Sequence, residues 1–200
     1  MSEHALDGRP LVVGIGGTVR GESSSEAGLR SALAAASAAG ARTLCLTAHD
    51  IALPFYEQRV PRSPQAVRLV EALRSADGLI VSSPGYHGAV SGLVKNALDY
   101  AEDLAGASRP YLDGIPVGCI GVAYGKQAAV AVVDQLRTVA HALRGFPTPY
   151  GAAVVAQRGA FRDGRCVDAS LDEQFARVGA QVAAFAATVR TSAAAFEPVA

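Results

Sequence analysis

The sequence has few cysteines, no tryptophan and no surplus of charge of either sign. Its 200 residues include three cysteines, and 18 Lys and Arg balance 18 Asp and Glu. A neutral chain has no bulk field that would draw it to nucleic acid or to an anionic membrane surface. No run approaches the roughly 20 apolar residues that a membrane-spanning helix needs. We therefore expect a protein that binds neither nucleic acid nor membrane.

Thiol pairs, targeting signals and metal-ligand spacings are also missing. The cysteines form no C-x-x-C pair, and Cys45 and Cys119 lie inside apolar runs, as buried thiols do in a reducing compartment. The first ten residues, MSEHALDGRP, lack the basic start and apolar core of a signal peptide. No H-x-E or H-E-x-x-H occurs. We expect a cytoplasmic protein without a metal site.

Apolar segments typical of strands alternate with amphipathic segments typical of helices. Strands are predicted within residues 9–17, 41–47, 78–84, 115–125 and 151–157, and helices within 24–41, 64–78, 90–106, 127–145 and 170–190. In the helix predicted at 64–78, the core face is expected to carry Val67, Val70 and Leu73. This alternation predicts an α/β fold, a parallel sheet with helices on both faces. We expect a single domain spanning 1–200, ordered over about residues 9–190, with loose termini of roughly eight and nine residues.

In such sheets, ligands bind beyond the carboxyl ends of the strands, near the switch point. The loops there are GGTVRGESSS (16–25), SPGYHGAVSG (83–92) and VAYGKQ (122–127), and we expect them to converge. The first loop fits neither common nucleotide motif. Val19 stands where the dinucleotide fingerprint needs its last glycine, and Glu22 stands where a P-loop needs lysine.

What remains in the first loop is a glycine turn, one arginine and a group of hydroxyls just before a helix. These groups are Gly16, Thr18, Arg20, Ser23, Ser24 and Ser25. Hydroxyl and backbone donors at a helix start, with one arginine, suit a phosphate monoester. The alternative is that the serines only cap the helix and that Arg20 is solvated.

The second loop contains two glycines, which let a backbone approach a flat ligand without an intervening Cβ. These are Gly85 and Gly88, and Ser91 is a candidate cap for the following helix. Backbone N–H groups and a helix start would favour a reduced flavin, which carries negative charge around N1 and O2. Tyr86 could offer its ring and His87 a hydrogen bond, although such residues in a turn can equally be solvated surface.

The segment SPGYHGAVSGLVKNALDY (83–100) resembles the S-P-x-Y-[NH]-G-[SA]-x-x-G-x-[LV]-K-N-A-[LI]-D signature of the NADPH-dependent FMN reductase family. The loop GGTVRGESSS resembles that family's phosphate loop, G-S-x-R-x-x-S, with Thr18 at the serine position. Over roughly residues 10–185, the resemblance implies a flavodoxin-like three-layer sandwich whose five-stranded parallel sheet has the order 2-1-3-4-5. Two departures are His87, where the family most often has Asn, and Tyr124 with Lys126 in the third loop.

By position, the resemblance also implies the residues that bind FMN. The phosphate would be held by Thr18, Arg20, Ser23 and Ser25, at the turn of Gly16. The isoalloxazine would be lined by Pro84, Gly85, Tyr86, His87 and Gly88, and bordered by Ala123, Tyr124 and Gly125.

The function this implies is an NAD(P)H-dependent FMN reductase, with NADPH or NADH as the donor. Hydride transfer to flavin N5 needs stacked rings and no acid or base side chain, so no catalytic side chain is predicted. The electrons would pass to free flavin for a partner flavin-dependent monooxygenase, or to a small quinone or azo compound. Arg59 and Arg62 could meet a nucleotide phosphate or could be solvated.

Two other functions fit a flavin site: a flavodoxin-type electron carrier and a flavin-binding redox sensor. Carriers tend to be acidic and to cover the flavin with aromatic residues, often Trp, whereas this chain is neutral and has no Trp.

The family resemblance further implies a homodimer or a dimer of dimers, with Leu93, Leu98 and Tyr100 toward the partner. Lys95 and Asp99 are four residues apart and are expected to pair on the helix surface.

Overall fold

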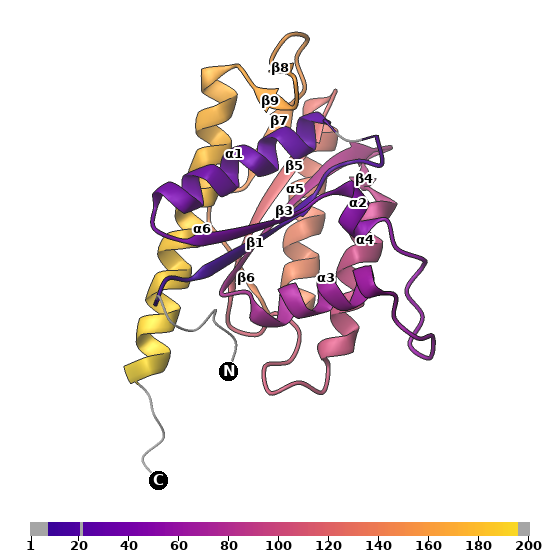
Figure 1. Cartoon of the computed structure of the whole chain (residues 1–200). Coiled ribbons are helices and arrows are strands. Elements are labelled where there is room, and N and C mark those ends of the chain that lie inside the picture. The colour runs from indigo at the N-terminus through magenta and orange to yellow at the C-terminus, as the bar shows by residue number, and fades with distance from the viewer. Residues whose placement is uncertain (1–7, 21, 196–200) are drawn as a thin grey trace.

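The structure is a computed structural model that describes residues 8–20 and 22–195 (Figure 1). The loose termini predicted from the sequence fall mostly outside these residues. A mixed, mostly parallel sheet of seven strands forms the middle layer. Its strands are β1 (Leu11–Gly16), β2 (Arg42–Leu46), β3 (Gly78–Tyr86), β4 (Ala89–Val90), β5 (Pro116–Ala123), β6 (Phe146–Pro147) and β7 (Ala152–Val155).

The strand order is β2-β1-β3-β5, with β6 and β7 both pairing with the outer side of β5. Since β5 and β7 are the fourth and fifth predicted strands, the order 2-1-3-4-5 is confirmed. The sequence did not indicate two short additions, β6 and the antiparallel β4. Both are two residues long, too short to show any periodicity.

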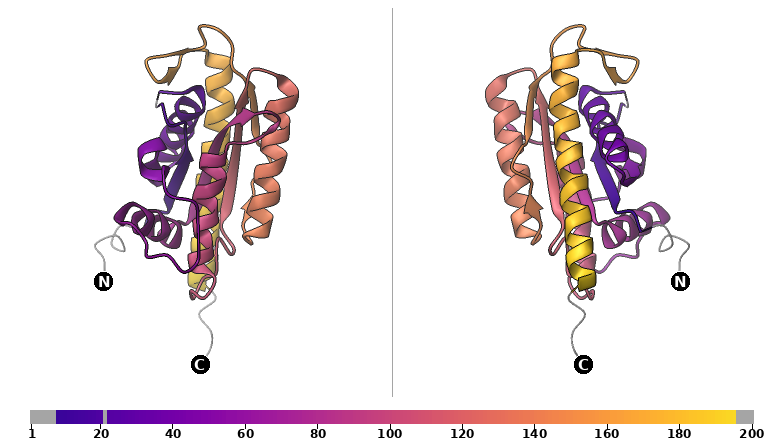
Figure 2. Two further views of the ribbon diagram at one scale, coloured as in Figure 1. Left: turned by 90° about the vertical axis from the view of Figure 1, so that its right-hand side faces the viewer. Right: turned by 90° about the vertical axis from the view of Figure 1, so that its left-hand side faces the viewer.

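Helices cover both faces of the sheet (Figure 2). They are α1 (Ser24–Ala38), α2 (Ala48–Ile51), α3 (Pro64–Ser75), α4 (Gly92–Asp99), the 3-10 helix η2 (Tyr100–Leu104), α5 (Lys126–Ala142) and α6 (Ala169–Ala195). Alternate strand residues face two separate cores: Val13 and Leu79 pack with α3, α4 and α5, whereas Val12 and Ile80 pack with α1 and α6. Burial on both faces explains why the strands are almost continuously apolar.

Three expectations about individual residues are wrong. Val67 is exposed, because the buried stripe of α3 runs through Ala66, Leu69, Val70 and Leu73. Leu98 and Tyr100 are 3% exposed and belong to the core of this chain, so neither is available to a partner. Sequence periodicity identified an apolar helix face but could not say which element covers it.

Two further expectations about side chains are confirmed, whereas the expected burial of Cys45 is not. Lys95 forms an ion pair with Asp99, and Cys119 is buried, which raises the pKa of its thiol to about 12. Cys45 is only half-buried, and Cys45, Cys119 and Cys166 are all free thiols. None of the described helices is both long and apolar enough to cross a lipid bilayer.

Candidate functional site

The three predicted loops meet at the carboxyl ends of the sheet and enclose two adjoining cavities. The larger, of about 390 Å³, is lined by Gly17, Thr18, Val19, Arg20, Pro84, Tyr86, Ser91, Gly92 and Leu93. The smaller, of about 300 Å³, is lined by Thr18, Glu22, Ser23, Ser24, Ser25, Pro84, Gly85, Tyr86, Val122, Ala123, Tyr124 and Ala156. The two cavities share Thr18, Pro84 and Tyr86. The expected convergence of the loops is therefore found.

The first loop ends in a well-formed helix start. Ser23 is the N-cap of α1, and its hydroxyl accepts a hydrogen bond from the backbone N–H of Glu26 at 3.2 Å. The hydroxyls of Ser23 and Ser25 lie 3.1 Å apart. Capping therefore accounts for Ser23 and not for the other serines of the loop. Thr18, Ser25 and the positive end of α1 also line the smaller cavity.

A buried carboxylate lies behind this helix start. Glu26 is 7% exposed, and its Oε1 accepts hydrogen bonds from Nε and Nη2 of Arg30 at 3.1 and 2.7 Å. The same bonds raise the pKa of the Arg30 guanidinium. Arg30 thus balances the negative charge of Glu26, which would otherwise weaken the attraction of the helix start for an anion.

Glycines 16 and 17 shape the first loop from within. A Cβ at Gly16 would lie 2.4 Å from the carbonyl oxygen of Ser82, so only glycine lets β1 approach β3 this closely. Gly17 has a φ of 106°, a conformation open mainly to glycine. Gly16 lines neither cavity, whereas Gly17, which the sequence interpretation did not include, lines the larger one.

The second loop is a tight β-hairpin between β3 and β4. Its two central residues, His87 and Gly88, have φ values of 52° and 82°, as in a type I′ turn. Gln135 of α5 holds the hairpin: its Oε1 accepts from Val90 N at 3.1 Å, and its Nε2 donates to Gly88 O at 2.9 Å. His87 and Gly88 are exposed and line neither cavity.

The glycines of this hairpin have reasons within the protein itself. Gly88 supplies the positive φ of the turn, and a Cβ at Gly85 would lie 3.0 Å from Ala123 Cβ and 3.2 Å from Val132 Cγ2. From the sequence alone, both glycines are expected to let a ligand approach the backbone closely. The structure explains them by turn geometry and packing, and only Gly85 lines a cavity.

Two buried serines, which sequence analysis did not single out, tie the loops together. Ser82 donates from its hydroxyl to the carbonyl oxygen of Ser25 at 2.7 Å. The Ser83 hydroxyl accepts from the backbone N–H of Ser91 at 3.0 Å, and Ser91 caps α4 as predicted. The sequence feature that could have identified these two residues is the pair of serines directly after the apolar residues of β3.

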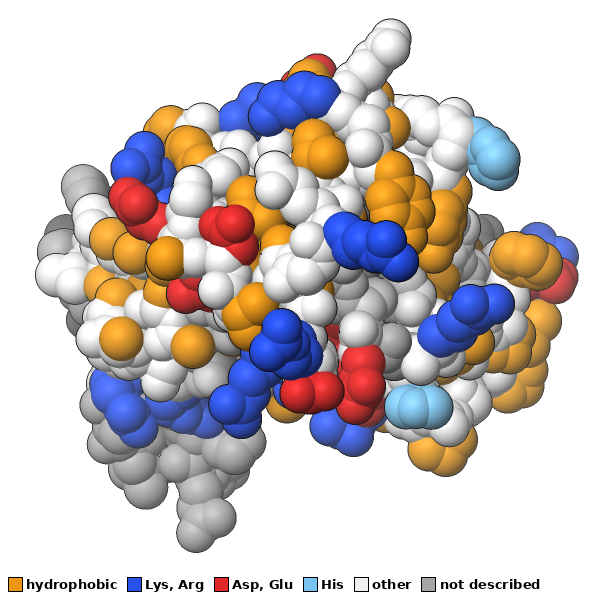
Figure 3. Space-filling view, turned by 90° about the horizontal axis from the view of Figure 1, so that it is seen from above, with side chains coloured by type: hydrophobic (Ala, Val, Ile, Leu, Met, Phe, Trp, Pro, Cys, Tyr) orange, Lys and Arg blue, Asp and Glu red, His pale blue; other side chains and the backbone are white. Residues whose placement is uncertain are grey.

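The third loop places an exposed tyrosine ring at the edge of the smaller cavity. Tyr124 is 92% exposed and Tyr86 is 53% exposed, and both line the smaller cavity. Ala123 lines it as well, whereas Gly125 is the N-cap of α5 and lies outside. Figure 3, which looks down on this end of the molecule, shows Lys and Arg side chains in several places across the surface, some of them beside Asp and Glu. Ala156, after β7, completes the wall and carried no sequence signal.

This arrangement can hold an anion beside a flat, partly apolar group. Hydroxyls and a helix start lie at one part of the hollow, and proline, small residues and tyrosine rings lie at the other. Across the part of the chain that the structure describes, no three His, Cys, Asp or Glu side chains are placed to share a metal ion.

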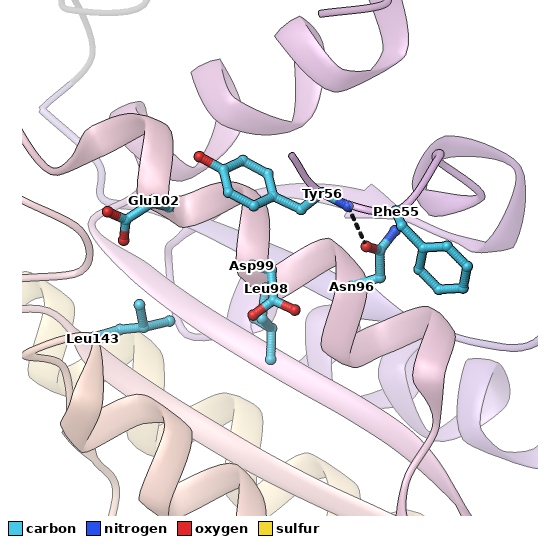
Figure 4. Close-up of a pocket in the computed structure, with 7 residues that line it drawn as sticks. All are labelled: Phe55, Tyr56, Asn96, Leu98, Asp99, Glu102 and Leu143. Atoms are coloured by element: carbon cyan, nitrogen blue, oxygen red, sulfur yellow. Dashed lines mark hydrogen bonds between the residues drawn. The ribbon is translucent and has the colours of Figure 1, made fainter. Parts of the chain in front are cut away.

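A separate cavity of about 350 Å³ lies beside α4, where the loop between α2 and α3 packs (Figure 4). Asn96 holds this loop by accepting from Tyr56 N at 2.9 Å and donating to Pro54 O at 2.9 Å. Arg62 pairs with Asp103 at 2.6 Å and lies 4.7 Å from the centre of the Tyr56 ring. Arg62 is therefore a structural residue of this loop and is not a solvated cation.

Comparison with known proteins gives consistent results. The family model described as NADPH-dependent FMN reductase matches residues 10–160. An FMN-dependent NADPH-azoreductase of Staphylococcus aureus (strain USA300) is 36% identical over 81 residues, 40% of this chain and 39% of that protein. The chain thus spans about two fifths of the length of the curated relatives it matches.

Solved structures with the same fold cover nearly the whole chain. FerB, a flavoenzyme NAD(P)H:(acceptor) oxidoreductase from Paracoccus denitrificans, has a TM-score of 0.69 at 20% identity over 91% of this chain and 98% of its own. A flavodoxin, WrbA-like protein from Agrobacterium tumefaciens has a TM-score of 0.61 at 19% identity over 90% and 98%. These likenesses show that the fold is flavodoxin-like.

Proposed function

The chain belongs to the NADPH-dependent FMN reductase family, and on that premise we propose that it reduces flavin with a nicotinamide donor where its three loops meet. The observation that carries this proposal is the shared wall of the two cavities. The smaller cavity contains both the serines at the start of α1 and the apolar wall. Thr18, Pro84 and Tyr86 join it to the cavity lined by Arg20, so an anion site and a flat apolar site form one hollow. When bound, FMN supplies the hydride acceptor and NADPH the hydride, a reaction that needs no acid or base side chain.

The FMN phosphate would be bound at the start of α1. Thr18, Ser23 and Ser25 offer hydroxyls, and the first N–H groups of a helix have no partner within the helix. Arg20 lines the adjoining cavity and adds a positive charge. Together these donors match a phosphate monoester, which has three acceptor oxygens and about two negative charges.

The isoalloxazine would lie against Pro84, Gly85, Tyr86, Ala123 and Tyr124. These residues line the smaller cavity beside the phosphate site. In this proposal Gly16, His87, Gly88 and Gly125 shape the loops from outside the contact surface. The rings of Tyr86 and Tyr124 are exposed at the edge of the smaller cavity, where a second flat substrate could stack on them.

We propose that the electrons pass to a small flat acceptor. Candidates are an azo compound or quinone, or a second flavin that is released to a partner monooxygenase. The azo acceptor is favoured by the identity shared with the Staphylococcus azoreductase over 81 residues.

We also propose that the chain forms a homodimer through the surface beside α4. Phe55 is 91% exposed, yet the backbone on both sides of it is held by Asn96. Because the backbone at Phe55 is already held, burying this side chain against a partner costs no further ordering of the loop. Phe55 also borders the 350 Å³ cavity, whose wall includes Leu143, so the same patch on a second copy could receive it.

Sedimentation of the wild type and of Phe55→Ser tests the dimer. The variant should shift toward monomer, whereas Phe185→Ser, which removes another exposed phenylalanine from α6 on the opposite face, should not. Equal behaviour of the two variants would contradict an interface at Phe55.

The proposed activity is tested by a visible spectrum and by NADPH oxidation with and without added FMN. A reductase oxidises NADPH continuously when FMN and an acceptor are present. A flavodoxin-type carrier would be yellow but inert to NADPH, and a redox sensor would bind flavin without sustained turnover. Either of those results would contradict the proposal.

A further inference from the structure

Two arginines face each other across a short hairpin that the sequence did not predict. Strands β8 (Phe161–Arg162) and β9 (Arg165–Cys166) are antiparallel, and Arg162 is directly paired with Arg165. Both side chains are exposed. Like charges in directly opposite positions repel each other. Within the described residues, neither arginine forms an ion pair with an acidic side chain. The hairpin therefore holds two positive charges side by side, and the one carboxylate between them in the sequence, Asp163, forms an ion pair with neither.

The hairpin is fixed rather than loosely attached. Its turn residues, Asp163 and Gly164, have φ values of 50° and 69°, as in a type I′ turn. Val167 N donates to Ala160 O at 2.8 Å at its base. Phe161 is half-buried and packs on Phe175, with ring centres 6.4 Å apart. Because alternate residues of a strand point to opposite sides, this anchoring turns the two arginines outward.

The hairpin borders the proposed flavin site. A methyl group at Gly164 would lie 3.6 Å from Cγ of Glu22, and Glu22 lines the smaller cavity. Ala156, just before the hairpin, lines the same cavity. Figures 1 and 2 show the hairpin at the same end of the sheet as the loop between β1 and α1.

Resting on the proposed function, we propose that Arg162 and Arg165 bind the 2′-phosphate of NADPH. A phosphate monoester carries about −1.5 to −2 charges at neutral pH, which two adjacent guanidinium groups can match with paired hydrogen bonds. The FMN phosphate already has its own donors at the start of α1. The other phosphate monoester in the reaction is the one that distinguishes NADPH from NADH, so this pair gives the enzyme its preference for NADPH.

The other arginines suggested by the sequence are poorer candidates for this role. Arg62 is engaged by Asp103 and stacked on Tyr56. Arg59 is exposed in the loop between α2 and α3, and no residue of that loop lines a flavin cavity, whereas the β8–β9 hairpin approaches Glu22 at the wall of the smaller one. Arg59 therefore provides a matched control for the loss of exposed positive charge.

The kinetic test compares NADPH and NADH as donors for the double variant Arg162→Ser/Arg165→Ser at saturating FMN. The KM for NADPH should rise by roughly tenfold or more, from the loss of charge-assisted bonds, while the KM for NADH stays unchanged. Arg162→Lys/Arg165→Lys should restore part of the preference, and Arg59→Ser should leave both KM values unchanged. Because the double variant removes a repulsion, its Tm should not fall.

A binding test does not depend on turnover. Calorimetry on the wild type should show that adenosine 2′,5′-bisphosphate binds more tightly than 5′-AMP, and the double serine variant should lose this difference. Equal losses for NADPH and NADH, or no preference for the bisphosphate, would overturn the assignment. So would a weaker affinity for FMN with unchanged riboflavin binding, since it would assign the arginines to the flavin phosphate. If the wild type binds no FMN, the proposed function fails, while the bisphosphate titration still tests the arginine pair.

Discussion

The hydroxyl of Ser82, in the middle of β3, donates to the backbone carbonyl of Ser25 in the first turn of α1, at 2.7 Å. Both serines are at most 2% exposed. On the adjacent residue, the Ser83 hydroxyl accepts from Ser91 N, so β3 is bonded to the starts of both α1 and α4. These bonds set the distance between the loop proposed for the phosphate and the loop proposed for the ring.

Ser82→Ala should therefore weaken both folding and flavin binding. It leaves the buried carbonyl of Ser25 without this partner, which should lower the free energy of unfolding by about 1–3 kcal/mol. FMN affinity should fall because the two loops are no longer held together. Urea denaturation and FMN titration measure the two effects. Ser37→Ala, an exposed serine of the same helix, should change stability by less than about 0.5 kcal/mol.

Arg20→Ala tests the phosphate site directly. Loss of one charge-assisted contact should weaken FMN binding by roughly one to two orders of magnitude. Riboflavin, which has no phosphate, should bind the variant and the wild type equally. Fluorescence titration with both flavins makes the comparison, with Arg59→Ala as the control for net charge. If riboflavin binding falls as much as FMN binding, the role proposed for Arg20 is wrong.

Gln135 offers a test of the hairpin that carries Tyr86. Gln135→Ala removes the bonds to Val90 N and Gly88 O, so hydrogen exchange at the Val90 amide should become faster. Gln135→Glu keeps the acceptor for Val90 but loses the donor to Gly88, and should have an intermediate effect. If Tyr86 borders the ring as proposed, FMN affinity should follow the same order. Unchanged exchange at Val90 in Gln135→Ala would show that the hairpin is held by other contacts.

Much of the fold could be predicted because both faces of the main strands are buried. Val12 and Val13 belong to opposite cores, and this makes the strand pattern apolar throughout. The loops of the site were also recognisable, since they follow the strands and are rich in glycine and hydroxyl residues. Their convergence followed from the parallel order of the sheet.

The remaining features depend on contacts between distant segments. Gln135 reaches the hairpin across 45 residues of chain, and no local pattern marks it. The β8–β9 hairpin has strands of two residues, too short to show alternation. Gly85 has a requirement that the sequence does not reveal: a Cβ there would crowd Val132, and the contact of Gly85 with a ligand stays a prediction.

Gly179→Ala should strongly destabilise the protein. A Cβ at this position would lie 1.8 Å from the carbonyl oxygen of Ala32, so α1 and α6 would have to move apart. We expect a loss of about 1–3 kcal/mol in the free energy of unfolding, measured by urea denaturation. Gly106→Ala, where a methyl group would meet nothing within 4 Å, should cost far less. Equal losses would mean that the helices separate easily.

The pairing of Asp103 with Arg62 should make stability depend on pH in the acid range. Hydrogen bonds from Arg62 and then from Tyr56 lower the pKa of the Asp103 carboxyl in the folded protein. A pKa that is lower in the folded than in the unfolded state adds stability above the unfolded value of about 3.9, and this is lost as pH falls through the folded value. Asp103→Asn should therefore be destabilising at pH 7, and its deficit relative to the wild type should shrink as pH falls below about 4. Urea denaturation of both proteins across this range measures the deficit, and a constant deficit would contradict the assigned cause.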